Sequence, residues 1–131
     1  MITIYGSGKY KYGYCHVFAL ALHKIFGYQI AILEDKDRQI IRDDLHKWWI
    51  YVPHVFCIKN GYIIDAFGIR KPSNMIRQSG KFTITNHKIH KIDSRMLYNH
   101  SLFKVNFYRI TKKNLTEAET FILKHKEKYE F

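Results

Sequence analysis

The sequence predicts an α+β fold in which a buried helix packs on a mostly antiparallel sheet and a second helix ends the chain. An apolar run with helical periodicity fills residues 14–26 and stops at Gly27. Asn60-Gly61 separates two apolar runs that are rich in β-formers, which is typical of a tight hairpin. Thr116-Glu117-Ala118-Glu119 matches a capping box, so we expect a terminal helix from there to about Tyr129.

Local patterns predict the elements of the first half. Weak alternation indicates an edge strand, and a stretch rich in Gly, Lys and Tyr indicates a loop before the first helix. A short strand, a polar helix or loop, and the two strands of the hairpin follow that helix. In chain order these segments are Met1 to Tyr5, Gly6 to Gly13, Tyr14 to Phe26, Tyr28 to Leu33, Asp37 to Lys47, Pro53 to Lys59 and Tyr62 to Phe67.

The second half is expected to add a short helical stretch, two strands around a turn at Asn86-His87, and one strand with clear alternation. In the terminal helix, Phe121, Ile122 and His125 are expected to face inward. The other segments are Asn74 to Arg77, Phe82 to Thr85, Lys88 to Ile92 and Phe103 to Ile110.

Length and composition favour a single folded domain over residues 1–131. Hydrophobic residues make up 47% of the chain and aromatic residues 16%, which argues against extensive disorder. No apolar run approaches the ~20 residues that span a bilayer. Because the chain does not begin with a basic and then apolar segment, we expect a cytoplasmic protein, or one delivered into a host cell without a signal peptide.

Cys15 stands where a thiol nucleophile is expected. Gly13-Tyr14-Cys15 opens the first helix, so the thiol would face the positive end of the helix dipole and its backbone N–H groups. Such a place favours the thiolate and offers donors to an oxyanion. On its own, a cysteine in an apolar helix is more often a core residue.

The hairpin supplies a base and a carboxylate to the same face. A two-residue loop at Asn60-Gly61 pairs Lys59 with Tyr62, and counting outward makes His54 and Asp65 diagonal neighbours, roughly 7–8 Å apart at the backbone. Asp65 would hold one ring nitrogen of His54 while the other faces the thiol. Taken singly, His54 is compatible with a structural histidine and Asp65 with a residue that closes a turn.

These residues resemble the papain-like cysteine hydrolases in the broad sense, which include NlpC-type amidases, transglutaminase-like proteins and the deamidase domains of bacterial toxins and effectors. The matching pieces, which cover roughly the first half, run from Gly13 to Leu22 and from His54 to Gly68. The resemblance implies a papain-like core with Cys15 as nucleophile, His54 as base and Asp65 as orienter.

One departure concerns the oxyanion hole. Papain has a glutamine a few residues before its cysteine, whereas residues 7–12 contain none. The Cys15 backbone N–H would then need a second donor, for which the candidates are Tyr12, Tyr14 and His16. Trp48 and Trp49, just upstream of the base, are candidate walls of a substrate cleft, although ordinary core packing explains them about as well.

The remaining cysteine and histidines indicate no further chemistry. Cys57 alternates onto the face opposite His54 and is interpreted as a core residue, although counting alone leaves a disulfide with Cys15 open. His16 and His23 lie two turns apart on the first helix, and a strand would turn His87 and His90 to opposite faces. We therefore assign no metal and no cofactor.

The second half carries most of the net charge of +11. Residues 71–131 hold thirteen Lys and Arg against five Asp and Glu, whereas residues 1–70 hold nine against six. A solvated basic face explains this pattern, and so does contact with an acidic protein or nucleic acid. The candidate contact residues are Lys88, Lys91, Arg95, Lys112 and Lys113.

Two functions follow from the sequence. The first is a thiol hydrolase or acyltransferase acting on an amide of a protein or peptide, in an effector, toxin or phage context. Deamidation of a glutamine side chain is slightly favoured over peptide or isopeptide cleavage, because 131 residues are few for an extended substrate groove. The second is a non-enzymatic basic domain that binds or regulates an acidic protein or nucleic acid.

Overall fold

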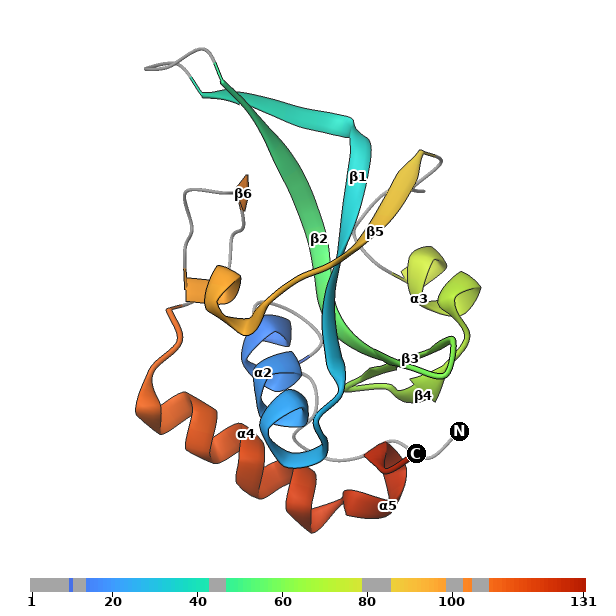
Figure 1. Cartoon of the computed structure of the whole chain (residues 1–131), viewed down its shortest axis with the longest axis vertical. Helices are drawn as coiled ribbons and strands as arrows, with labels where there is room; N and C mark the ends of the chain where they lie inside the picture. Colours follow the sequence, from blue (N-terminus) through green and yellow to red (C-terminus); the bar gives the residue numbers. More distant parts are fainter. Residues whose placement is uncertain (1–9, 11–13, 43–46, 79–85, 99–102, 105–108) are drawn as a thin grey trace.

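The computed structural model describes residues 10, 14–42, 47–78, 86–98, 103–104 and 109–131, with only the backbone described at 37–42, 47–51, 77–78 and 103–104. Figure 1 shows one strongly twisted sheet, with α2 and α4 on one side and α3 on the other. The α+β class and the mostly antiparallel sheet are confirmed. The elements are α2 (Cys15–Phe26), β1 (Gln29–Arg42), β2 (Lys47–Lys59), β3 (Tyr62–Asp65), β4 (Gly68–Arg70), α3 (Pro72–Gln78), β5 (His87–Lys91), η1 (Ser94–Tyr98), β6 (Phe103–Lys104), α4 (Lys112–Lys124) and α5 (Lys126–Tyr129).

The helix α2 forms as the apolar pattern predicts. Every residue from Cys15 to Leu22 is buried, because one side of the helix packs on β2 and the other on α4. It ends at Gly27, which adopts the left-handed conformation at φ 75° and donates its N–H to the His23 carbonyl over 2.8 Å. The His23 ring, through Nδ1, also bonds to the Tyr28 carbonyl at 2.8 Å, which joins the end of the helix to the start of β1.

The sheet has the order β4-β3-β2-β1-β5, and the short β6 pairs parallel with β2. The expectation of a helix or loop over Asp37 to Lys47 was wrong, because β1 continues to Arg42 and β2 already begins at Lys47. Pairing of Ile40 with Trp49 and of Ile41 with Trp48 extends the hairpin past two register shifts. Cross-strand pairing here outweighs the low strand preference of the charged residues.

The predicted hairpin register is confirmed. Asn60 and Gly61 both have positive φ, 50° and 80°, as a type I′ turn requires. Lys59 pairs with Tyr62, and the ladder continues to Cys57 and Ile64. A second tight turn then leads from β3 into β4, where Asp65 pairs with Gly68.

The two faces of this sheet bury separate cores. Val55, Cys57 and Ile64 belong to the core that also contains α2, α4 and α5. Phe56 and Ile63 point to the other face, where Met75 of α3 covers them. Alternation along β2 and β3 therefore divides their apolar side chains between the two cores, as the period of a strand requires.

The terminal helix begins earlier than the sequence predicts. Its N-cap is Thr111, which exchanges side-chain and backbone hydrogen bonds with Asn114, so Thr116 lies inside α4. An asparagine occupies the third position, where a glutamate is expected, and the capping box predicted at Thr116 to Glu119 was therefore wrong. The helix also covers α2 rather than the sheet, with Ala118 and Ile122 buried against it.

The chain end returns to the β3–β4 turn. The Tyr129 hydroxyl donates to the Ala66 carbonyl at 3.3 Å, and the Tyr28 hydroxyl donates to the Tyr129 carbonyl at 2.9 Å. The Phe131 N–H in turn donates to the Tyr28 hydroxyl at 2.7 Å. The C-terminal residues thereby fasten the turn next to Asp65 to the start of β1.

The other expected elements have mixed outcomes. The helical stretch at 74–77 is part of α3, and β5 matches the strand expected at 88–92 within a residue. Of the strand expected at 103–110, the structure has β6, while residues 105–108, like 1–5 and 82–85, lie outside the described residues. Among the helices that the structure describes, none has the length and apolar character to span a membrane.

Candidate active site

Cys15 is the first residue of α2 and is almost fully buried. The N-cap residue, Tyr14, makes no side-chain cap. The start of a helix concentrates partial positive charge from its backbone N–H groups, which favours an anion on the thiol sulfur. The position predicted for Cys15 is therefore present.

His54 and Asp65 meet as the hairpin register predicts. The Nε2 atom of His54 donates to Oδ2 of Asp65 over 2.8 Å, and both side chains are buried, at 4% and 2% exposure. His54 also lies nearly parallel to the Phe56 ring, with 5.7 Å between ring centroids. The imidazole is therefore held by a carboxylate on one nitrogen and by an aromatic neighbour along its face.

The His54 imidazole is strongly basic in this setting. Burial by itself lowers the pKa of His54, but hydrogen bonds and charge interactions with Asp65 and Cys15 outweigh burial and raise the pKa to about 9. The group is consequently an imidazolium at neutral pH. Because Nε2 is bonded to Asp65, Nδ1 is the ring nitrogen left for the thiol.

From the described residues, the Asp65 side chain accepts three hydrogen bonds. Besides His54, Oδ2 accepts from Nη2 of Arg70 at 2.6 Å, and Oδ1 accepts from the Phe67 N–H at 3.0 Å. Burial raises the pKa of Asp65, but His54 and Arg70 outweigh it and hold the pKa below its usual value. Asp65 thus closes the β3–β4 turn, as the plainer interpretation held, and also binds His54.

Arg70 was missed in the sequence. Its partner Ile63 lies two residues before Asp65 on β3, so alternation brings Arg70 and Asp65 to the same face. The signal that would have found it is the tight turn after Asp65. The pairing of β4 can be predicted from the sequence only after that turn has been recognised.

Cys57 provides the contrast to Cys15. It is fully buried, and its thiol donates to the Ala19 carbonyl of α2 over 3.2 Å. Burial raises the pKa of the Cys57 thiol, and the charge of Asp65 adds to the effect. Both cysteines are free, which removes the disulfide left open by counting and confirms Cys57 as a core residue.

The other candidates are spread around this centre. His16 is buried in α2, and Tyr14 is half-buried beside Cys15. Tyr12 lies outside the described residues, and for Trp48 and Trp49 only the backbone is described, on β2. Within the described part of the chain, no three His, Cys, Asp or Glu residues gather as metal ligands would. His90 bonds through Nε2 to Glu34 at 2.7 Å.

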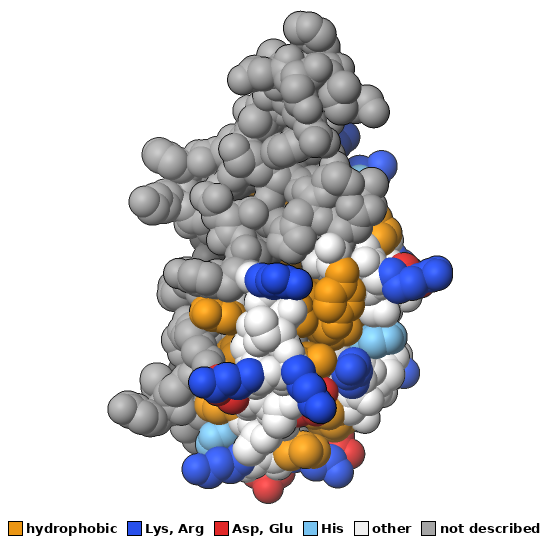
Figure 2. Space-filling model, turned by 90° about the vertical axis from the view of Figure 1, so that its left-hand side faces the viewer, with side chains coloured by type: hydrophobic (Ala, Val, Ile, Leu, Met, Phe, Trp, Pro, Cys, Tyr) orange, Lys and Arg blue, Asp and Glu red, His pale blue; other side chains and the backbone are white. Residues whose placement is uncertain are grey.

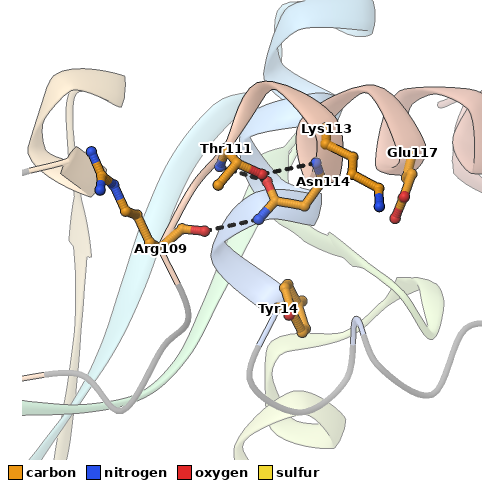
Figure 3. Close-up of a pocket in the computed structure, with 6 residues that line it drawn as sticks. All are labelled: Tyr14, Arg109, Thr111, Lys113, Asn114 and Glu117. Atoms are coloured by element: carbon orange, nitrogen blue, oxygen red, sulfur yellow. Dashed lines mark hydrogen bonds between the residues drawn. The ribbon is translucent and has the colours of Figure 1, made fainter.

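A pocket of about 380 Å³ opens beside the start of α2. Figure 3 shows Tyr14 on one wall and the first residues of α4 opposite it. Asn114 stiffens that wall, because its side chain donates to the Arg109 carbonyl over 2.8 Å and its carbonyl oxygen accepts from the Thr111 N–H. The lining residues are Tyr14, Arg109, Thr111, Lys113, Asn114 and Glu117.

The basic residues singled out in the sequence are all exposed. Arg95 pairs with Asp93 through Nε at 3.1 Å, at the surface. Figure 2 shows Lys and Arg side chains spread over one face with acidic, polar and apolar side chains between them, not as a continuous basic surface. The five residues lie on β5, η1 and α4, and they are Lys88, Lys91, Arg95, Lys112 and Lys113.

No family model matches this chain, and no curated protein or solved structure matches it. A thiol at a helix start, an imidazolium beside it and a buried carboxylate behind the imidazolium are the three groups that thiol-dependent acyl transfer requires.

Proposed function

We propose that this protein is a thiol hydrolase or acyltransferase that acts on amides through Cys15, His54 and Asp65, with a papain-like core. One observation carries the proposal. His54 interacts with Asp65 through Nε2 and with Cys15 as well, so a single imidazole links the thiol to the carboxylate. A merely structural histidine needs no partner at a helix N-terminus.

The chemistry begins with the ion pair between the Cys15 thiolate and the His54 imidazolium. The sulfur attacks the amide carbonyl, and backbone N–H groups at the start of α2 stabilise the oxyanion. His54 then gives its proton to the leaving nitrogen, which departs as ammonia or an amine and leaves a thioester on Cys15. Water or an acceptor amine gives up a proton to His54 as it attacks the thioester. The C–S bond then breaks, which releases the acid or the new amide and restores the Cys15 thiolate and the His54 imidazolium.

Within this class we favour the side-chain amide of glutamine. A primary amide needs only a narrow entrance, whereas cleavage of a backbone needs room on both sides of the scissile bond. Cys15 is buried at 3% exposure, which suits a narrow approach. The pocket that includes the neighbouring Tyr14 supplies room for the rest of a protein substrate.

Intact-mass analysis of unfolded casein, a protein with many accessible glutamines, tests the proposal. The expected result is conversion of amide to acid with release of ammonia, lost in Cys15→Ala and retained in the matched control Cys57→Ala. Mass gained from an added amine supports the acyltransferase branch, and fragments that require Cys15 would show proteolysis instead. Equal activity of Cys15→Ala and the unaltered protein would refute a thiol mechanism.

The alternative is a basic binding domain without catalysis. The exposed Lys and Arg side chains of the second half support it, although they are interspersed with other residues. If the biological effect of the protein survives Cys15→Ala but not charge reversal of the exposed lysines, the binding function is the correct one.

A further inference from the structure

Arg70 shares one carboxylate oxygen with the base. Nη2 of Arg70 lies 2.6 Å from Oδ2 of Asp65, and Nε2 of His54 lies 2.8 Å from the same oxygen. The Arg70 side chain is 10% exposed, and its guanidinium carbon lies 4.3 Å from the centre of the Phe67 ring. The cation is therefore fixed by a carboxylate and by an aromatic face.

We propose that Arg70 is a positioning residue of the site, which orients the Asp65 carboxylate and limits the negative charge that His54 experiences. This inference rests on the proposed function of Cys15, His54 and Asp65. Its role is exerted through Asp65, which bonds to both Arg70 and His54.

Hydrogen bonds fix the orientation of the Asp65 carboxylate. Oδ1 of Asp65 accepts a hydrogen bond from the Phe67 N–H, and Oδ2 accepts one from Arg70 and one from His54. A carboxylate held at both oxygens cannot rotate without breaking a buried hydrogen bond. Oδ2 is thereby kept within hydrogen-bond distance of Nε2 of His54, which leaves Nδ1 for the thiol.

Arg70 also places a positive charge beside the Asp65 carboxylate. Arginine remains protonated at any pH at which the protein is folded, so Arg70 always opposes a second positive charge on the same carboxylate. Tyr129 and Cys57 also feel the charge of Asp65, but burial raises the pKa of each, which keeps both neutral. Among the described residues, Asp65 and Cys15 raise the pKa of His54, and Arg70 acts on Asp65.

The consequence concerns proton transfer. An imidazolium that is stabilised too strongly gives up its proton too slowly to the leaving nitrogen. Arg70 reduces this stabilisation while it keeps Asp65 ionised. Asp65 can therefore orient His54 without stabilising the imidazolium by its full negative charge.

NMR titration of the His54 imidazole in labelled protein tests the inference, with Arg70→Gln, Arg70→Lys and Asp65→Asn compared to the unaltered chain. In Arg70→Gln the proton affinity of His54 should rise about tenfold, and in Asp65→Asn it should fall. Arg70→Lys keeps the charge and should restore the original titration. On casein, Arg70→Gln should lower kcat about tenfold to a hundredfold with little change in KM.

The outcomes separate the inference from the function on which it rests. If folded Arg70→Gln keeps the original His54 titration and kcat, and only its melting temperature falls, Arg70 is structural and the inference is wrong. If the His54 titration shifts as expected but the unaltered protein modifies no amide, the arrangement stands and the proposed function fails. If Arg70→Gln does not fold, Arg70→Lys must still match the original titration, and a shift there would contradict the charge argument.

Discussion

The stability of the protein should depend on the protonation of His54. Its pKa is raised from 6.5 to about 9 in the folded protein, so the folded state keeps a proton that the unfolded chain releases between those values. Stability from this proton is fully present below pH 6.5 and is lost as the pH rises through about 9. His54→Gln removes the titrating group and should remove this dependence.

The expected size follows from the two pKa values. The difference between 6.5 and about 9 corresponds to about 3 kcal/mol in the free energy of unfolding. With a denaturant slope of about 2 kcal/mol per molar urea, the unfolding midpoint should fall by roughly 1–2 M across this window. Because His54 is buried, solvent screening reduces this free-energy contribution only slightly.

Urea unfolding at several pH values, followed by far-ultraviolet circular dichroism, measures the effect. The quantity to compare is the difference between the unaltered protein and His54→Gln at each pH. Cys57 also loses stability as the pH rises, because burial raises the pKa of its thiol, but it is present in both proteins and cancels. Asp65 has a lowered pKa and contributes in the acid range instead.

A flat difference curve between pH 6.5 and about 9 would contradict a raised pKa of His54 in the folded protein. It would mean that His54 titrates in the folded protein as it does in the unfolded chain, and that the bonds to Asp65 and Cys15 do not stabilise the imidazolium. A curve that rises with pH would be still more damaging, because it would indicate that burial outweighs both partners.

Three further predictions concern other residues. Iodoacetamide should modify Cys15 before Cys57 in the folded protein, as peptide mapping would show, and equal rates would argue against activation. Gly68→Ala should lower stability by about 1–3 kcal/mol, because φ is 105° and the new Cβ would lie 3.1 Å from the Lys128 side chain. Gly61→Ala is the control, since φ is 80° there and the new Cβ meets no such contact. Equal melting temperatures for the two variants would show that the contact with Lys128 costs no stability. If the basic half binds an anionic partner, retention on heparin should weaken with salt and with charge reversal, and unchanged retention would leave only a solvated surface; the residues to reverse are Lys88, Lys91, Lys112 and Lys113.

The contact between His54 and Asp65 was predictable because its determinants are local. Asn60-Gly61 fixes the register of the hairpin, and the strand period then places both residues on one face. Helix propensity and the stop at Gly27 likewise place Cys15 at a helix start. What local rules cannot give is the approach of that helix to the hairpin, which depends on packing across the whole core.

Each wrong prediction has its own cause. Residues 37–42 contain few strand-forming residues, but they pair with β2 across a hairpin, and the preferences of single residues do not encode that pairing. The start of α4 was misplaced because Asn114 performs the task expected of a glutamate. Arg70 was missed because its partner is defined by two successive turns, and an error in either turn would move it to the opposite face.

Asp65 has two structural roles, and both must be considered when its variants are interpreted. It closes the β3–β4 turn through the Phe67 N–H, and it neutralises the buried His54 and the partly buried Arg70. An asparagine there leaves Arg70 and His54 without an anion, so a loss of activity would mix a weaker base with a less stable turn. Cys15 also helps to stabilise the His54 imidazolium, so Cys15→Ala should lose some stability as well as activity. Activity lost in Cys15→Ala under conditions where the variant remains folded, together with a shifted His54 titration in Arg70→Gln, would separate catalysis from folding in a site where most residues serve both.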